Sequence, residues 1–185
     1  MDYPDYQHLF DTMTFTDEAA IIKAAEIVLK GKDRYEGVVD NTNVPWHIIG
    51  LTHYRESTCN FSRHPHEGSP LTSRTKYVPI GRPLAGNPPF TWEESAKDCY
   101  FTLKHLDKID TWDIVTILKT LEQFNGTGYI KYHPEVLTPY LWSGTAFYTV
   151  GKYAGDGVFD KNLKDKQMGC APIFRYLTDK TLNLV

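Results

Sequence analysis

The chain has 185 residues, of which 41% are hydrophobic, which is enough for a domain with a buried core and excludes a disordered or fibrous protein. Its net charge of -3 gives no support for nucleic-acid binding, and no stretch is apolar for long enough to span a membrane. We therefore expect a single domain over residues 1–185, with residues 1–15 as a candidate N-terminal extension.

The three cysteines, Cys59, Cys99 and Cys170, are widely spaced. They form neither a disulfide framework nor a C-x-x-C zinc pattern, so reduced thiols in a cytosolic protein fit best. The N-terminal segment has acidic residues and no apolar run, so it does not predict a secretory signal peptide.

Two helices are predicted in the first third of the chain. Over about Thr16 to Lys30, apolar residues recur at helical spacing, and Thr16 could cap this helix. A second helix is expected from Pro45, with Asn43 as its cap, to near Cys59.

Residues 62–90 are rich in Pro, Gly, Ser, Thr and His, and only Tyr77–Ile80 resembles a strand, so we expect a loop-rich lobe with a short β-hairpin. Thr91 and Glu94 then form a capping box that predicts the start of a helix. The helices expected from there onward cover about 91–106, 111–124 (ended by Gly126), 138–153 and 165–177 (broken by Pro172). The predicted fold class is α+β, mainly α.

The segment most informative about chemistry is residues 46–57, an apolar helix that ends in a carboxylate. Glu56 follows Ile49 by seven positions and Thr52 by four, so it projects from the inward-facing side of the helix. Partial burial there disfavours the charged form of a carboxyl group, as a general acid near neutral pH requires. The alternative interpretation is a surface ion pair with a cation such as Arg55.

Three motifs in chain order resemble those of goose-type lysozymes and soluble lytic transglycosylases. The sequence ESTCN at 56–60 resembles their E-S-x-x-[ND] signature, in which the glutamate ends a core helix. FNGTG at 124–128 resembles their [YF]-N-x-G loop, and TPYLW at 138–142 resembles a later T-x-x-Y-V segment. The stretches VPWHIIGLTHYREST and SPLTSRTKYVPIGRP also look like lysozyme-family proteins encoded by bacteriophages and some bacteria.

The resemblance implies a lysozyme-like fold, in which a helical lobe and a small β-hairpin lobe flank a cleft. It implies cleavage of the β-1,4 bond between N-acetylmuramic acid and N-acetylglucosamine in peptidoglycan, with Glu56 as the general acid. The substrate contacts that it implies are Ser57, Asn125, Tyr129 and Tyr140. No metal or organic cofactor is implied.

A second catalytic carboxylate is expected in the loop-rich lobe. Inverting glycosidases need a base that activates water, with the two carboxyl groups about 6.5–9.5 Å apart. Related phage lysozymes place this residue shortly after the acid, and Glu67 is the only carboxylate between Glu56 and Glu93. Thr72 follows it and could help to hold the water. Glu67 in a plain exposed turn is the alternative, and Asp156 is a weaker candidate for the base.

Three histidines, His53, His64 and His66, could suggest zinc, because His-x-His is a common ligand pair. No further ligand completes the set at the usual spacing, so we expect hydrogen-bonded loop histidines and no metal site.

The expected partner is the glycan strand of peptidoglycan, bound by a monomer that neither inserts into a membrane nor binds nucleic acid. Without a signal peptide, a phage endolysin would reach the wall from the host cytoplasm through a holin, or the protein would be carried by the virion. Glu67 favours hydrolysis over the anhydro product of a lytic transglycosylase. A non-catalytic glycan-binding or virion protein on the same fold is the alternative from another class.

Overall fold

The computed structural model describes residues 3–155 and 157–182, except for the side chains of 180–182. The chain divides into two compact units, Met1–Glu26 with Asp113–Val185 and Ile27–Trp112. Helices dominate both units, and the sheet among the described residues is two-stranded and antiparallel. The α+β, mainly α class is therefore confirmed, whereas a single domain stays a prediction.

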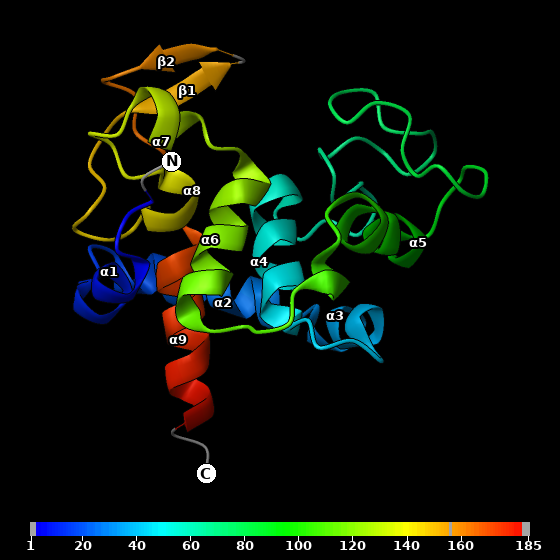
Figure 1. The fold of residues 1–185 in the computed structure, drawn as a ribbon, viewed down its shortest axis with the longest axis horizontal. Helices are drawn as coiled ribbons and strands as arrows, with labels where there is room; N and C mark the ends of the chain where they lie inside the picture. The colour runs from blue at the N-terminus through cyan, green and yellow to red at the C-terminus, as the bar shows by residue number, and fades with distance from the viewer. Residues whose placement is uncertain (1–2, 156, 183–185) are drawn as a thin grey trace. The chain divides into compact units, whose positions relative to one another are not determined.

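The first unit is a set of helices around an apolar core, with the small sheet at its edge (Figure 1). Its elements are α1 (Tyr6–Thr12), most of α2 (Glu18–Leu29), α6 (Ile114–Asn125), α7 (Gly128–Tyr132), α8 (Pro139–Trp142), β1 (Lys152–Gly155), β2 (Val158–Asp160) and α9 (Cys170–Leu182). Helix α6 packs against α1 and α8, and α8 packs against α9. Leu118, Leu141 and Ile173 of these helices are fully buried. The first 15 residues thus include a helix that is packed into this unit.

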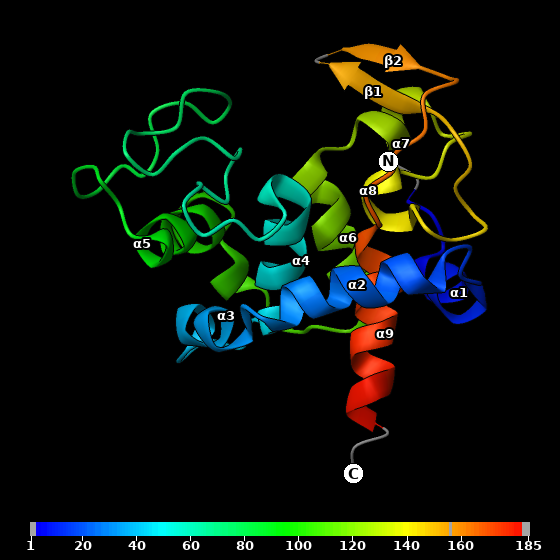
Figure 2. The ribbon, with the colours of Figure 1, turned by 180° about the vertical axis from the view of Figure 1, so that it is seen from behind.

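The second unit has fewer helices and a long loop region. It contains α3 (Lys32–Val39), α4 (Trp46–Ser57), α5 (Trp92–Lys97), the π-helix η1 (Asp98–Leu103) and the 3-10 helix η2 (Leu106–Lys108). Helix α3 packs beside α4 (Figure 2). The core around α4 is aromatic: neighbouring rings of Tyr35, His53, Phe61 and Trp92 have centroids 4.6 to 5.8 Å apart.

The helices predicted from apolar periodicity are found as α2, α4 and α6, but two of the predicted caps are wrong. Asp17 caps α2 instead of Thr16, because its Oδ1 accepts the N–H of Ala20 at 3.0 Å. Asn43 does not cap α4, because its amide donates to the carbonyl of Ile109 at 2.7 Å.

The capping box at Thr91 and Glu94 is present as predicted, and the helix that it starts continues from α5 into η1. Asp113 caps α6 by accepting the N–H of Thr116 at 2.7 Å, and this helix ends at Gly126 with a φ of 98°.

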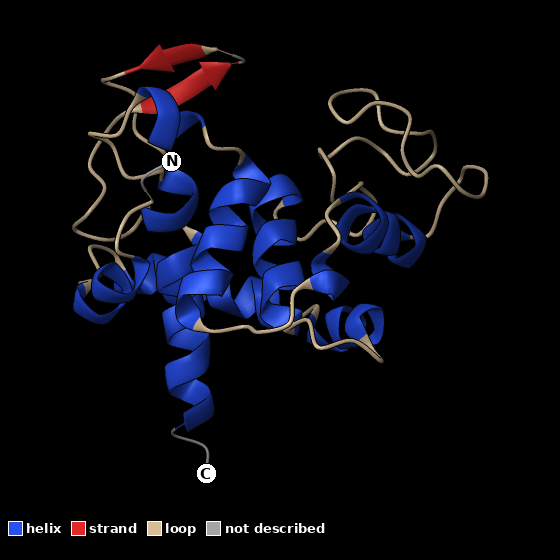
Figure 3. Cartoon of the chain, in the orientation of Figure 1, coloured by secondary structure: helices blue, strands red, loops and turns tan. Residues whose placement is uncertain are grey.

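The β-hairpin predicted at Tyr77–Ile80 is absent, and residues 58–91 are loops and turns (Figure 3). Residues 75–82 instead close on themselves, because Thr75 donates its N–H to the carbonyl of Arg82 at 2.8 Å and its hydroxyl to that of Pro79. Strands β1 and β2 form the sheet, and they belong to the other unit. The prediction of a small β-hairpin lobe after α4 was therefore wrong.

The helix predicted over 138–153 is a single turn, α8. Beyond it Gly144 has a φ of 89°, and Thr16 donates its N–H to the Gly144 carbonyl at 2.9 Å. Pairing with a distant segment therefore replaces the helix. The last helix begins at Cys170 and not near residue 165, so Pro172 lies in its first turn, where proline is tolerated, and does not break it.

No helix in the described part of the chain is both long and apolar enough to cross a membrane.

Candidate active site

Glu56 lies in the last turn of α4. The inner face of this helix, including Ile49 and Thr52, is fully buried, and Glu56 lies one turn further along at half-burial. The helix stops directly afterwards, because Thr58 adopts a left-handed conformation with a φ of 54°. Burial raises the pKa of the neighbouring Cys99 thiol, and the negative charge of Glu56 adds to that rise. Glu56 is thus half-buried in the last turn of α4.

A pocket of about 540 Å³ opens at the end of α4, and it lies entirely within the second unit. Glu56–Thr58 form one part of its lining, and the turn Glu67–Pro70 with Arg63 forms another. Lys76 and Tyr77 complete it. The two predicted catalytic carboxylates, Glu56 and Glu67, therefore line the same pocket together with Ser57.

Gly68 is the residue that lets these two segments approach. It has a φ of 81°, and a Cβ atom at this position would lie 3.1 Å from the backbone oxygen of Glu56. Both the conformation and the contact favour glycine. Further bonds fix the turn, since Gly68 donates its N–H to the carbonyl of His64 at 2.9 Å and accepts from Arg63 Nη1 at 2.7 Å. The backbone beside Glu67 is thereby held against the end of α4.

Glu67 is not a plain exposed turn residue. It is half-buried, and its Oε1 accepts a hydrogen bond from the hydroxyl of Ser69. Its Oε2 is buried and has no hydrogen-bond partner among the described residues. A buried carboxylate oxygen without a donor costs free energy. Ser69 was missed from the sequence, although a hydroxyl two positions after a turn carboxylate is a recognisable signal.

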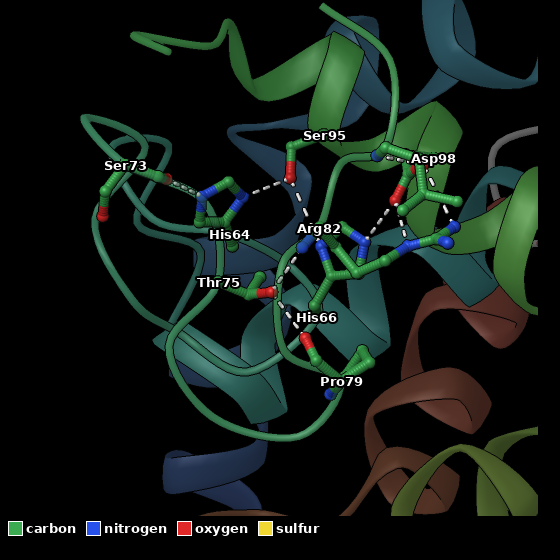
Figure 4. Close-up of polar contacts among 9 residues, drawn as sticks. His64, His66, Ser73, Thr75, Pro79, Arg82, Ser95 and Asp98 are labelled. Carbon is green, nitrogen blue, oxygen red and sulfur yellow. Dashed lines mark hydrogen bonds and ion pairs between the residues drawn. The ribbon is translucent and has the colours of Figure 1, made fainter. Parts of the chain in front are cut away.

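A buried polar network holds the loop that carries Glu67 onto α5 and η1 (Figure 4). His64 contacts Ser95 Oγ through Nδ1 at 2.6 Å, and Ser95 Oγ lies 3.3 Å from His66 Nδ1. His66 Nε2 lies 2.9 Å from Asp98 Oδ2, and Arg82 donates to both Asp98 oxygens at 2.8 and 3.0 Å. These contacts anchor the loop at His64 and His66, next to Glu67, and again at Arg82.

The hydrogens of this network can be assigned from its acceptors. The Ser73 carbonyl, 2.8 Å from His64 Nε2, and the Asp98 carboxylate can only accept, so both histidines carry a hydrogen on Nε2. Both Nδ1 atoms then face Ser95, whose hydroxyl has one hydrogen to donate. The contact of Ser95 Oγ with His64 is shorter than its contact with His66, so the hydroxyl hydrogen is assigned to the bond with His64. Burial lowers the pKa of His66 to about 4, which keeps that ring neutral at pH 7.

Ser95, His66 and Asp98 are the groups of a hydrolytic triad, but the hydrogen of the Ser95 hydroxyl is assigned to His64 and not to His66. Ser95 is fully buried, so its hydroxyl is closed to a substrate. The arrangement is structural: it positions the pocket-lining loop.

Of the other predicted residues in this unit, Ser57 lines the pocket and its hydroxyl lies 3.3 Å from the carbonyl of His53. Thr72 is exposed and is not part of the pocket lining, so the structure does not bring it together with Glu56 and Glu67.

Three predicted substrate contacts lie in the first unit. Asn125 is the exposed last residue of α6, and Tyr140 is buried in α8. Tyr129 is buried in α7, where its hydroxyl accepts the N–H of Tyr153 at 3.3 Å. Burial raises the pKa of Tyr129 to about 12. Their role in substrate binding stays a prediction. Asp156, the weaker candidate for the base, lies outside the described residues.

The three histidines considered as zinc ligands are hydrogen-bonded, but only His64 and His66 are loop residues, because His53 lies in α4. His64 and His66 belong to the polar network, and His53 Nδ1 lies 3.1 Å from the hydroxyl of Tyr35. Among the residues that the structure describes, no group of three or more His, Cys, Asp or Glu side chains could hold a metal ion.

Comparisons of the chain with models of known families, with characterised proteins and with solved structures find no match. The case for a function therefore depends on the pocket and the sequence motifs that line it.

Proposed function

We propose that the chain is a glycoside hydrolase that cuts the β-1,4 bond between N-acetylmuramic acid and N-acetylglucosamine in peptidoglycan. The observation that carries this proposal is that Glu56 and Glu67 line one pocket, with the backbone of Gly68 against that of Glu56. Two carboxyl groups flanking the scissile bond are what glycoside hydrolysis requires. The resemblance of residues 56–60 to the Glu-Ser signature selects peptidoglycan as the substrate.

In this proposal Glu56 is the general acid. It lies half-buried at the end of the buried face of α4 and lines the pocket, where a bound sugar can receive its proton. It donates its proton to the glycosidic oxygen as the bond to the anomeric carbon breaks, and the departing sugar leaves with a free hydroxyl. Positive charge then develops on the remaining sugar ring.

Glu67 is the base in the same proposal. The Ser69 hydroxyl holds Oε1, and the carboxylate lies on the pocket lining, where it accepts a hydrogen from water. As the water oxygen bonds to the anomeric carbon, its proton passes to Glu67, and one molecule of water is added across the broken bond. A lytic transglycosylase would use the sugar's own 6-hydroxyl instead and would not need this base. The position of Glu67 therefore favours hydrolysis.

The test is the rate at which purified protein clears a peptidoglycan suspension. Glu56→Gln keeps the shape of the side chain but has no proton to donate, so we expect nearly all activity to be lost in a folded protein. The matched control is Glu36→Gln, because Glu36 is an exposed glutamate of the same unit that pairs with Lys32 at 3.5 Å. It should lyse at the wild-type rate.

Wild-type clearing by a folded Glu56→Gln protein would contradict the proposal. Binding of peptidoglycan by the wild-type protein without any clearing would show a non-catalytic glycan-binding protein instead. As an active enzyme, the protein would act as an endolysin released from the host cytoplasm or as a lysin carried by the virion.

A further inference from the structure

The loop from Lys76 to Leu84, here called the apolar loop, exposes large apolar side chains. Tyr77 is 70% exposed, Val78 86%, Ile80 75% and Leu84 66%. Single exposed apolar residues are normal, but four within eight positions form a patch of the kind that marks an interaction site.

The base of the apolar loop is fixed, so its tip is presented outward and does not collapse onto the unit. Thr75 and Arg82 are buried at the base, and Gly81 donates its N–H to the Thr75 carbonyl at 2.9 Å. The ion pair between Arg82 and Asp98, 2.8 Å long, ties this base to η1 (Figure 4). A rigid base lowers the ordering cost when the tip docks on a surface.

Lys76 is the charged residue of the apolar loop outside the Arg82–Asp98 ion pair, and Glu56 and Glu67 line the same pocket as Lys76. Between Glu67 and Glu93 the chain carries Arg74, Lys76 and Arg82 and no carboxylate, although the whole chain has a net charge of -3. Lys76 is exposed and forms no hydrogen bond or ion pair with any residue that the structure describes. Aliphatic side chains next to an unpaired cation match the boundary between the acyl chains and the anionic headgroups of a bilayer.

We propose that the apolar loop docks the protein peripherally on a bilayer that contains anionic lipid. Val78 and Ile80 enter the interface, and Lys76 contacts the headgroups. A glycan is a poorer occupant of the patch, because sugar rings stack on aromatic faces and three of its four side chains are aliphatic. Lys76 and Tyr77 also line the pocket, so docking would hold the pocket close to the membrane surface.

The proposal is tested by co-sedimentation of the full chain with vesicles of phosphatidylcholine alone or with an added share of phosphatidylglycerol. We expect binding to the anionic vesicles and little to the neutral ones. Val78→Ser with Ile80→Ser should weaken binding about tenfold or more, because two aliphatic side chains no longer enter the interface. The matched control is Val115→Ser with Val158→Ser, which changes valines that are 40% and 60% exposed in the other unit and should bind as wild type.

Lys76→Gln should weaken binding to the anionic vesicles about fivefold, and added salt should reduce the difference. Val78 and Ile80 are not part of the pocket lining, so their double variant should cleave soluble glycan fragments like wild type. Failure of the proposed hydrolase activity would leave the vesicle result unaffected.

Absence of binding to anionic vesicles, or equal binding by the double variant, would overturn the proposal. Concentration-dependent dimerisation that the double variant abolishes would show that a second copy of the chain covers the loop instead.

Discussion

In the first unit, helices with apolar faces enclose leucine, isoleucine and tryptophan side chains, and repeating backbone hydrogen bonds hold most of the structure. In the second unit, residues 58–91 have no regular helix or strand, and side-chain hydrogen bonds to α5 and η1 hold them. The candidate chemistry lies in the second region. The end of α4 and this loop each present one carboxylate to the same pocket, and polar side-chain contacts help to hold the loop in place.

Buried carboxyl groups show the difference most clearly. In the second unit, Asp98 pairs with Arg82 and His66. In the first unit, Glu122 of α6 is buried and accepts the hydroxyl hydrogen of Tyr6 of α1. Burial raises the pKa of Glu122, which shows that the charged form is disfavoured there. One unit thus uses a buried ion pair, and the other uses a carboxyl group in apolar surroundings.

The largest predicted effect follows from replacing these two groups. Asp98→Asn leaves the Arg82 guanidinium buried without its counter-charge, so the free energy of unfolding should fall by about 3–5 kcal/mol. Glu122→Gln keeps an oxygen that can accept from Tyr6, so its cost should stay below about 1.5 kcal/mol. Urea unfolding followed by circular dichroism measures both values. Equal losses of unfolding free energy in the two variants would show that the ion pair of Asp98 stabilises the fold no more than one buried hydrogen bond does.

The response to pH should also differ between the units. Burial lowers the pKa of His53 and His66 from 6.5 to about 4. Below pH 6.5 the unfolded chain takes up these protons first, so the second unit should lose stability as the pH falls, by about 3 kcal/mol per histidine at pH 4. The raised pKa of Glu122 acts in the opposite direction: its contribution is present below pH 4.5 and is lost as the pH rises through the raised value.

Hydrogen exchange, corrected for the intrinsic effect of pH, separates these two responses. Between pH 7 and pH 5, protection of amides in α4 and α5 should fall more than protection in α6. Equal changes in both units, or an unchanged second unit, would contradict the assignment of neutral buried histidines.

A smaller effect is expected from two glycines with positive φ. Gly68→Ala should cost about 1–2 kcal/mol of stability through its left-handed backbone. It should also lower kcat, because the new Cβ atom crowds the Glu56 oxygen at 3.1 Å. Gly157→Ala is the control, since Gly157 has a φ of 71° in the first unit and nothing within 4 Å of a Cβ. It should lose similar stability and keep full activity; a matching loss of kcat would show that strain alone explains the effect.

Helices with strong local signals were predictable from the sequence. The apolar periodicity of α2, α4 and α6 and the capping box before α5 depend on residues within a few positions, which a sequence shows directly. The predictions failed where contacts with residues far away in the sequence determine the local structure. The segment after α8 pairs with residues near Thr16, and Asn43 bonds to Ile109, 66 positions away.

The same reason limits what could be predicted of the site. Glu56 follows from its motif at a helix end, and Glu67 from being the only carboxylate in its segment. The anchors of the loop were not predictable, because the contact of His66 with Asp98 joins residues 32 positions apart that share no local pattern. Thr72 is close to Glu67 in sequence but lies outside the pocket lining, whereas the turn at Gly68 brings the Ser69 hydroxyl to the Glu67 carboxylate.

The mass of the products made from purified peptidoglycan in water enriched in oxygen-18 tests the central claim most directly. The account predicts reducing muramic ends that carry one added water with the heavy oxygen. It also predicts that Glu67→Gln forms them about 10²-fold more slowly, the scale expected for loss of a general base. Anhydro ends without the heavy oxygen, formed at the same rate by Glu67→Gln, would contradict the claim that the two carboxylates of this pocket act together in hydrolysis.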